Sequence, residues 1–250
     1  MPYVFGIHAV ESILINRPND VICLFLKESR TDKRKEKLYQ LAIAKNINTQ
    51  ICSINVLNEM VPEKHQGAVV QIKDELKEVS SIELDLGKLT LLIEKAEGKA
   101  LILILDGITD PQNLGACLRT SDAAGVTAVV IPKNKSVGIT PVVRKVACGA
   151  AEVVPIFQVT NLARFLRQLK KQGIWIHGAS EKAKKQIYDV DLRDDVAIVL
   201  GGESKGLRRL TQENCDSIFR IPMGGSVTSL NVSVAAGICM FESVRQRGSA

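Results

Sequence analysis

Three short segments of this chain combine glycines with amide, hydroxyl, carboxylate and guanidinium side chains. They are residues 105–125, 200–207 and 221–247. Their polar side chains of interest are Asn113, Arg119, Glu203, Ser229 and Asn231. Glycine lets the backbone approach a ligand closely, and hydroxyls and amides at the start of a helix add to its free N–H groups. This mixture predicts a polar ligand-binding pocket.

Each of these side chains also has a purely structural interpretation. Asn113 is positioned to cap a helix that starts at Leu114 and ends at Gly125. Arg119 on that helix is then an ordinary surface cation. Glu203 follows two glycines and suits the start of a helix, where the macrodipole favours an acid. Spacing alone leaves both interpretations open.

Known nucleotide-binding and metal-binding motifs do not fit these segments. LGGESKGL at 200–207 lacks the GxGxxG spacing, which argues against a dinucleotide-dependent oxidoreductase. The phosphate-loop pattern fails because Gly206 is followed by Leu207 and Arg208. The 6 cysteines are far apart without a CxxC pair, and His and Cys do not cluster, so we expect no metal.

The elements that must position the polar segments alternate between aliphatic strands and helices. Strand-like segments rich in apolar residues occur at residues 100–108, 127–132, 175–180 and 196–202. Strands without polar alternation that are joined by helices predict an α/β fold with a parallel sheet covered on both faces. Ligands bind such sheets beyond the carboxyl ends of the strands, which is where the polar segments begin.

The first 75 residues predict a separate, small α/β domain. The expected elements are strands at 21–26 and 67–72 and an amphipathic helix over 33–45. Residues 76–98 are rich in acids and predict a linker that contains one short helix. Residues 99–250 then form the second domain.

The charge balance is compatible with a polyanionic partner. Lys and Arg number 33 against 27 Asp and Glu, a net charge of +6. The run at 29–37 concentrates cations and is either a solvated helix face or a phosphate-contacting edge. KHQG at 64–67 is either a plain turn or a nucleic-acid contact, with His65 itself structural. Aromatic residues make up 4%, which argues against a stacking platform for single-stranded bases.

We expect a cytoplasmic protein without a membrane partner. The longest unbroken aliphatic run, 100–105, is far shorter than the roughly 18 residues that span a bilayer. The first residues lack the basic and long apolar regions of a secretion signal. Cysteine usage fits a reducing compartment.

The three polar segments resemble, in order, the motifs of the SpoU (TrmH) family of RNA ribose 2′-O-methyltransferases. The matching stretches are NxxxxxR from Asn113 to Arg119, LGGESKGL from Leu200 to Leu207, and IPMxGSVxSLNVSVAxGIC from Ile221 to Cys239. The opening YVFGIHAVESIL and the KHQG stretch are similar to the substrate-binding domain of the branch that modifies a guanosine in 23S rRNA.

The resemblance implies a SPOUT-like parallel α/β domain with a C-terminal trefoil knot, working as a homodimer. It implies that S-adenosylmethionine is bound by backbone near Gly201, Ile221 and Leu230. The implied catalytic group is Asn113, Arg119, Glu203, Ser229 and Asn231. The implied partner is 23S rRNA or an assembling large-subunit particle, with no DNA.

The implied reaction moves a methyl group from a sulfonium to a ribose 2′-hydroxyl of a guanosine, in line, while the alcohol loses its proton. Guanidinium groups are poor proton acceptors at neutral pH. We therefore expect Arg119 to orient the target phosphate and stabilise the nucleophilic oxygen, with Glu203 and Asn113 holding its plane. The N-terminal domain is expected to hold RNA through Arg30, Arg34 and nearby lysines. The alternatives are a tRNA ribose methyltransferase and a catalytically silent RNA-binding assembly factor.

Overall fold

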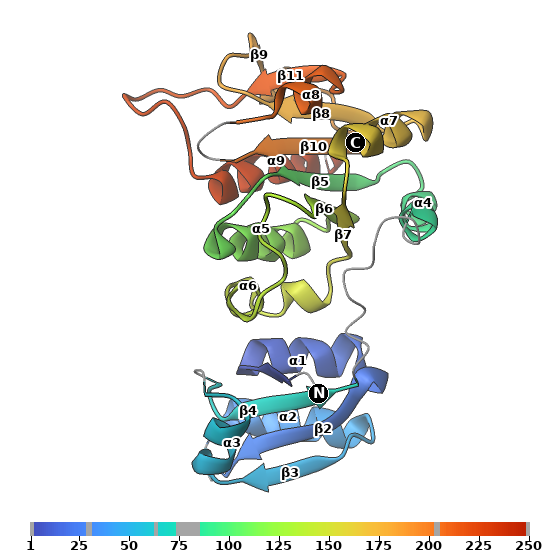
Figure 1. Ribbon diagram of the computed structural model, residues 1–250. Helices are drawn as coiled ribbons and strands as arrows, with labels where there is room; N and C mark the ends of the chain where they lie inside the picture. The colour runs from blue at the N-terminus through green and yellow to red at the C-terminus, as the bar shows by residue number, and fades with distance from the viewer. Residues whose placement is uncertain (1–2, 29–31, 63–64, 74–85, 203–205, 249–250) are drawn as a thin grey trace. The chain divides into compact units, whose positions relative to one another are not determined.

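The computed structural model describes residues 3–28, 32–62, 65–73, 86–202 and 206–248 (Figure 1). The chain forms two compact units, each treated by itself below. The N-terminal unit comprises Met1–Glu78 together with Arg144–Val153. The C-terminal unit comprises Val79–Val143 together with Val154–Ala250.

The N-terminal unit contains a four-stranded sheet in the order β1-β4-β2-β3. Its strands are β1 Tyr3–Phe5, β2 Val21–Lys27, β3 Thr49–Cys52 and β4 Ala68–Ile72, and its helices include α1 Ile7–Asn16, α2 Lys33–Ala44 and α3 Ile54–Met60, with a short 3-10 turn at Pro18–Asp20. β2 and β3 are parallel, whereas β4 runs antiparallel to β1 and β2. The strands expected at 21–26 and 67–72 and the helix expected over 33–45 are confirmed.

Alternation along β2 builds a core on each face of this sheet. Leu24 and Leu26 pack with the apolar sides of α1 and α2. Cys23 and Phe25, which point the other way, pack with Leu57 of α3. Both faces of the small sheet are therefore covered.

The C-terminal unit contains a seven-stranded sheet in the order β7-β6-β5-β10-β8-β11-β9. The strands are β5 Leu101–Asp106, β6 Ala128–Pro132, β7 Ile156–Val159, β8 Trp175–Ala179, β9 Lys185–Gln186, β10 Val196–Gly201 and β11 Ser217–Arg220. Every neighbouring pair is parallel. The expected α/β fold with a parallel sheet is confirmed, and the four expected strands are β5, β6, β8 and β10.

Helices lie on both faces of the large sheet (Figure 1). The remaining elements are α4 Leu86–Lys95, α5 Pro111–Ala123, α6 Pro141–Ala147, α7 Leu162–Lys171, α8 Arg209–Glu213 and α9 Val232–Gly248, with 3-10 turns at Ala150–Glu152 and Ile187–Asp189. α4 and α7 pack against Ile102 and Ile104 of β5. α9 contacts β5 and β10 and also packs against α5. Among the described residues, no helix is long and apolar enough to cross a bilayer.

The start of α5 differs from the expectation. Asp110 is the capping residue, and its Oδ1 accepts a hydrogen bond from the backbone N–H of Gln112 at 2.9 Å. Pro111 is the first helical residue, a position where its missing N–H costs nothing. Asn113 is therefore not the cap. It lies within the first turn, and its side chain makes a tertiary contact with Asn231. The helix ends at Ala123, and Gly125 follows with φ of 65°, as expected for a glycine that stops a helix.

Candidate active site

A pocket of about 850 Å³ lies at the carboxyl edge of the large sheet, within the usual size range of small-molecule sites. Backbone from three connections lines it, namely the turn after β8, the turn after β10, and the segment between β11 and α9. The three residues expected to hold a cofactor all line it: Gly201, Ile221 and Leu230. Two of the expected catalytic residues, Ser229 and Asn231, line the same pocket.

Gly201 and Gly202, which line this pocket at the end of β10, have no room for a side chain. The backbone N–H of Gly206 donates to the carbonyl of Gly202 at 2.9 Å and closes the turn after β10. A Cβ on Gly201 would lie 2.0 Å from the carbonyl carbon of Gly206. A Cβ on Gly202 would lie 2.8 Å from the backbone oxygen of Gly107. Gly201 and Gly202 therefore present bare backbone to a ligand.

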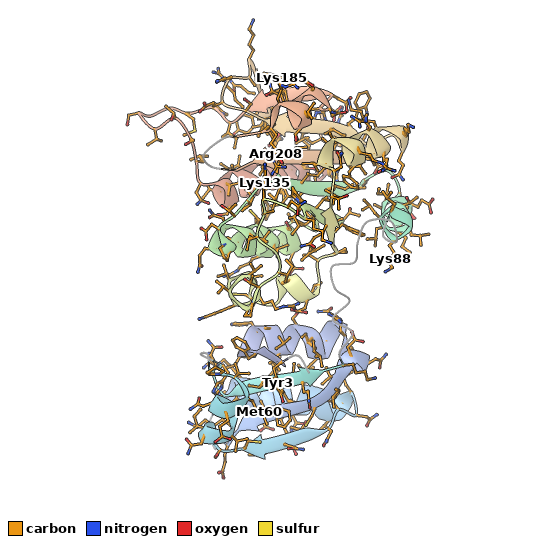
Figure 2. The ribbon with its side chains drawn as sticks, in the orientation of Figure 1. Tyr3, Met60, Lys88, Lys135, Lys185 and Arg208 are labelled. Atoms are coloured by element: carbon orange, nitrogen blue, oxygen red, sulfur yellow. The ribbon has the colours of Figure 1, made fainter. Side chains whose placement is uncertain are left out.

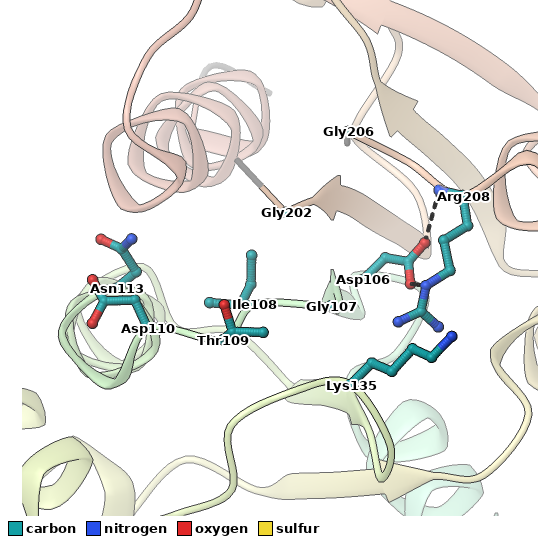
Figure 3. A pocket seen from close by; sticks show the side chains of 10 residues that line it. All are labelled: Asp106, Gly107, Ile108, Thr109, Asp110, Asn113, Lys135, Gly202, Gly206 and Arg208. Atoms are coloured by element: carbon teal, nitrogen blue, oxygen red, sulfur yellow. Dashed lines mark hydrogen bonds and ion pairs between the residues drawn. The ribbon is translucent and has the colours of Figure 1, made fainter. Parts of the chain in front are cut away.

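A second pocket, of about 560 Å³, adjoins the first (Figure 3). Its lining consists of Asp106, Gly107, Ile108, Thr109, Asp110, Asn113, Lys135, Gly202, Gly206 and Arg208. Gly202 and Gly206 line both pockets, so the glycine turn separates the two. We call the cavity of about 850 Å³ the large pocket and the cavity of about 560 Å³ the small pocket.

One hydrogen bond joins the two pockets. Asn231 Nδ2 donates to Asn113 Oδ1 at 2.9 Å, linking the start of α9 to the first turn of α5. The other end of the Asn231 amide caps α9, because its Oδ1 accepts from the backbone N–H of Ser233 at 2.9 Å and from the Ser233 hydroxyl at 2.6 Å. Both amides are thus held in fixed orientations where the pockets meet.

The remaining two expected catalytic residues are Arg119 and Glu203. Arg119 is exposed on α5, and it lines neither pocket. Glu203 lies outside the described residues. The structure therefore brings together Asn113, Ser229 and Asn231. The catalytic roles of Arg119 and Glu203 stay predictions.

Asp106 and Arg208 are site residues that the motifs did not single out. The Asp106 side chain is fully buried, and its Oδ2 accepts from the backbone N–H of Arg208 at 3.1 Å. Arg208 Nε lies 3.4 Å from Asp106 Oδ1, which accepts no hydrogen bond among the described residues. This ion pair fastens the chain after the glycine turn to the end of β5. An acid at the end of an aliphatic strand is the signal that would have found Asp106.

Comparison with known proteins places this site in a family. Residues 100–241 match the model of the SpoU rRNA Methylase family, and residues 3–76 match the model for RNA 2′-O ribose methyltransferase substrate binding. The chain belongs to the SpoU rRNA methylase family. The resemblance of the three polar segments to this family is thereby confirmed.

Relatives in the SpoU family align over nearly the whole chain. A 23S rRNA (guanosine-2′-O-)-methyltransferase RlmB from Shewanella oneidensis is 51% identical, covering 98% of this chain and 98% of the relative. The protein of that name from Coxiella burnetii is 50% identical, covering 98% of this chain and 95% of the relative. A solved RNA 2′-O ribose methyltransferase has a TM-score of 0.74 at 25% identity, covering 98% of this chain and 88% of the other. The methyltransferase AviRb from Streptomyces viridochromogenes, solved with AdoMet, shares the fold with a TM-score of 0.74 at 21% identity, covering 99% of this chain and 91% of the other.

The thiols near this SpoU site are unsuited to nucleophilic chemistry. Burial raises the pKa of Cys117 on α5 and of Cys239 on α9 to about 12. Burial also raises the pKa of Cys215 to about 12. A thiol must ionise to act as a nucleophile or metal ligand, so these three are packing residues at neutral pH. In the described part of the chain, no group of His, Cys, Asp and Glu is arranged to hold a metal ion.

Proposed function

We propose that this chain transfers a methyl group from S-adenosylmethionine to the ribose 2′-hydroxyl of a guanosine in 23S rRNA, during maturation of the large ribosomal subunit. The observation that carries the proposal is the 51% identity, over 98% of both chains, to a relative that bears this activity in its name. The structure adds a reason in the site itself, because two adjoining pockets meet at the Asn113–Asn231 hydrogen bond. One pocket suits a donor and the other an acceptor.

The large pocket fits S-adenosylmethionine. Gly201 and Gly202 leave no room for side chains, and the backbone near Gly201, Ile221 and Leu230 supplies hydrogen-bonding groups. When bound, this cofactor supplies an electrophilic methyl group on a positively charged sulfur. The protein's task is to hold the donor and the ribose oxygen in line and to exclude other orientations.

The proposed catalytic residues are Asn113, Arg119, Glu203, Ser229 and Asn231. Asn113 and Asn231 fix the junction of the pockets, where the ribose hydroxyl would lie. Ser229 lines the large pocket directly before Asn231 and is a hydroxyl donor to the same region. Arg119 would bind the target phosphate and stabilise the oxygen as it loses its proton, with Glu203 as its partner.

We further propose the domain organisation expected from the sequence. Residues 1–75 would be the RNA substrate-binding domain, 76–98 the linker, and 99–250 the methyltransferase domain with its trefoil knot. The family matches at 3–76 and 100–241 support these bounds. The second half of the linker is α4, which packs through Leu89 and Ile93 into the core of the large sheet.

The N-terminal unit would hold the RNA backbone. Asp32 caps α2 and pairs with Arg34 at 3.5 Å and Lys35 at 3.3 Å, so part of the basic run is neutralised within the protein. The Arg34 side chain is still 68% exposed, which leaves it available to phosphate. Arg30 lies outside the described residues. A ribosomal substrate, whether free 23S rRNA or an assembling particle, would place the enzyme in the cytoplasm, with neither DNA nor membrane as a partner.

A homodimer is the proposed assembly, and α9 supplies support that the sequence did not. Val234, Phe241 and Val244 are exposed by 50%, 47% and 38%. Spacings of seven and three residues place them on one side of the helix. The opposite side of α9 is buried through Val232 and Ala236.

The test is methyl transfer from labelled S-adenosylmethionine to 23S rRNA, with ribose methylation mapped in cells that contain or lack the active protein. We expect one guanosine to gain a 2′-O-methyl group. Asn231→Ala should bind RNA and lose the transfer. Methylation of tRNA instead would indicate the first alternative. RNA binding together with no calorimetric signal for S-adenosylmethionine or its demethylated product would contradict the proposal and indicate a silent assembly factor.

A further inference from the structure

The small pocket contains two cations that the proposed mechanism does not use. Lys135 and Arg208 lie at one end of the cavity, and their side chains extend toward each other (Figures 2 and 3). Arg208 uses its Nε and its backbone N–H to hold Asp106. Among the described residues, the Lys135 ammonium makes no hydrogen bond or ion pair, and the Arg208 guanidinium pairs with Asp106 alone, at its Nε. These donors are therefore open to a ligand.

Lys135 is held at the pocket by its backbone. It has φ of 60°, an unusual value for a residue with a side chain. The residues after it are tied to the loop that follows β5, because Ser136 Oγ donates to the Ile108 carbonyl at 3.0 Å and Val137 N–H donates to the same oxygen at 2.8 Å. The Lys135 side chain is thus aimed by a fixed loop.

Among the described residues that line the small pocket, the charges balance. Two cations, Lys135 and Arg208, are matched by two acids, Asp106 and Asp110. A phosphate bound there would bring a further negative charge beside two carboxylates. A neutral ligand with hydrogen-bond acceptors avoids that cost, because it can accept from the cations without adding charge.

The far end of the small pocket meets the site of methyl transfer. Asp110 and Asn113 lie there on α5, with Ile108 and Thr109 between them and the cations (Figure 3). A nucleotide with its ribose at Asn113 would therefore extend its base toward Lys135 and Arg208. Guanine presents two adjacent acceptors, O6 and N7, whereas adenine presents N7 beside an amino donor.

We propose that the small pocket binds the base of the acceptor nucleotide, and that Lys135 and Arg208 select guanine by donating to O6 and N7. The inference rests on the proposed function, since it requires a nucleotide acceptor. The small pocket would thus determine which base is accepted, a function separate from the transfer of the methyl group.

The test uses an RNA fragment that contains the methylated guanosine, with that nucleotide replaced by inosine, 7-deazaguanosine or adenosine. Inosine keeps both acceptors and should be methylated within a few-fold of guanosine. The other two should lose about 10-fold to 100-fold in kcat/KM, the discrimination expected of a good cation–guanine contact. With the guanosine RNA, Lys135→Met should lower kcat/KM by a similar factor. With the 7-deazaguanosine RNA, Lys135→Met should lower kcat/KM little below the wild-type value. Lys135→Arg should restore most of the kcat/KM on guanosine.

Lys133→Met is the matched control, because Lys133 is an exposed lysine of the same connection that lines neither pocket. It should keep the wild-type order of substrates. If Lys135→Met lowers transfer to all four RNAs by one common factor, the lysine binds phosphate and the inference is overturned. Equal wild-type rates on guanosine and adenosine would also overturn it.

A binding measurement separates this inference from the proposed function. Saturation-transfer NMR of wild-type protein with GMP and with AMP should show a stronger signal for GMP, and Lys135→Met should remove the difference. If no RNA is methylated but GMP is preferred through Lys135, the proposed function fails and the base pocket stands. Equal or absent signals for both nucleotides, without methylation, would overturn both.

Discussion

The side-chain amide of Asn231 uses its two ends for different contacts. Its Oδ1 caps α9 through Ser233, and its Nδ2 donates to Asn113. Asn231→Asp keeps the cap and loses the donor, so we expect nearly unchanged thermal stability and at least about 10-fold slower methyl transfer, the equivalent of one hydrogen bond. Asn231→Ala should also lose the cap, at about 1 kcal/mol in urea unfolding. An Asp variant with full activity would remove the Asn113 contact from the mechanism.

His65 should make the stability of the protein depend on pH. The ring is buried, its Nδ1 accepts from the Gly67 N–H at 3.0 Å, and its Nε2 lies 2.9 Å from Asn58 Oδ1. Burial, and then the charge of Lys27, lowers the pKa of His65 in the folded state. The unfolded chain binds the proton more readily, so this stability is complete above the ordinary pKa of about 6.5 and is lost as pH falls through the lower folded value.

Urea unfolding at several pH values between about 7.5 and 5 checks this expectation, since the range spans the ordinary histidine pKa. His65→Gln should show a shallower decline in the free energy of unfolding than the wild type. His8→Gln is the control, because His8 is an exposed histidine of the same unit. The same decline in all three proteins would contradict the expectation.

At the level of single residues, the sequence predicted the large pocket well and the rest of the site less well. Gly201, Ile221 and Leu230 line one pocket because each lies at or after a strand that ends at the same sheet edge. The Asn113–Asn231 contact spans 118 positions and has no local signal. Arg119 lies six positions after Asn113, which on an α-helix turns it well away from the same side.

At the level of elements, long aliphatic strands were predictable and the short strands β9 and β11 were not. β5 and β10 are buried along their length, so their composition alone identifies them. β9 has two residues and β11 four, and both are shaped by their neighbours more than by their own sequence. The start of α5 was misplaced by the Asn113 interpretation, although Asp110 followed by Pro111 is the stronger helix-start signal.

The side chain of Arg247 ties the C-terminal end of α9 to several backbone carbonyls. The guanidinium of Arg247 donates to the carbonyls of Lys99, Ala100, Leu192 and Asp194. Arg247→Ala leaves these carbonyls without that donor, and we expect a loss of about 2 kcal/mol in the free energy of unfolding. Arg193→Ala is the matched control, because Arg193 pairs with Asp191 at the surface and should change stability little. Equal effects of the two substitutions would show that the Arg247 hydrogen bonds contribute little to stability.

At the level of the whole molecule, local sequence patterns predicted which helices and strands form. They did not predict the order of the strands in the sheet or the topology of the chain. The parallel order β5-β10-β8-β11 places β10 directly beside β5, although 89 residues separate Asp106 from Val196. Such long-range pairing is not encoded in any one segment, and a knot is a rare exception to the usual topology rules. The proposed trefoil knot therefore rests on family resemblance. The proposed dimer rests on family resemblance and on the exposed apolar side of α9.

The apolar side of α9 makes the dimer testable. Val234, Phe241 and Val244 remain exposed on a helix whose other side is buried, and burying such a surface against a second copy would stabilise the assembly. Light scattering after size-exclusion chromatography should give about twice the mass of one chain. Phe241→Glu should yield monomers, since a buried unpaired carboxylate opposes association. Leu91→Glu, on the 57% exposed Leu91 of α4, should remain dimeric as the matched control. A monomeric wild type, or a Phe241→Glu protein that stays dimeric, would place any interface elsewhere or remove it.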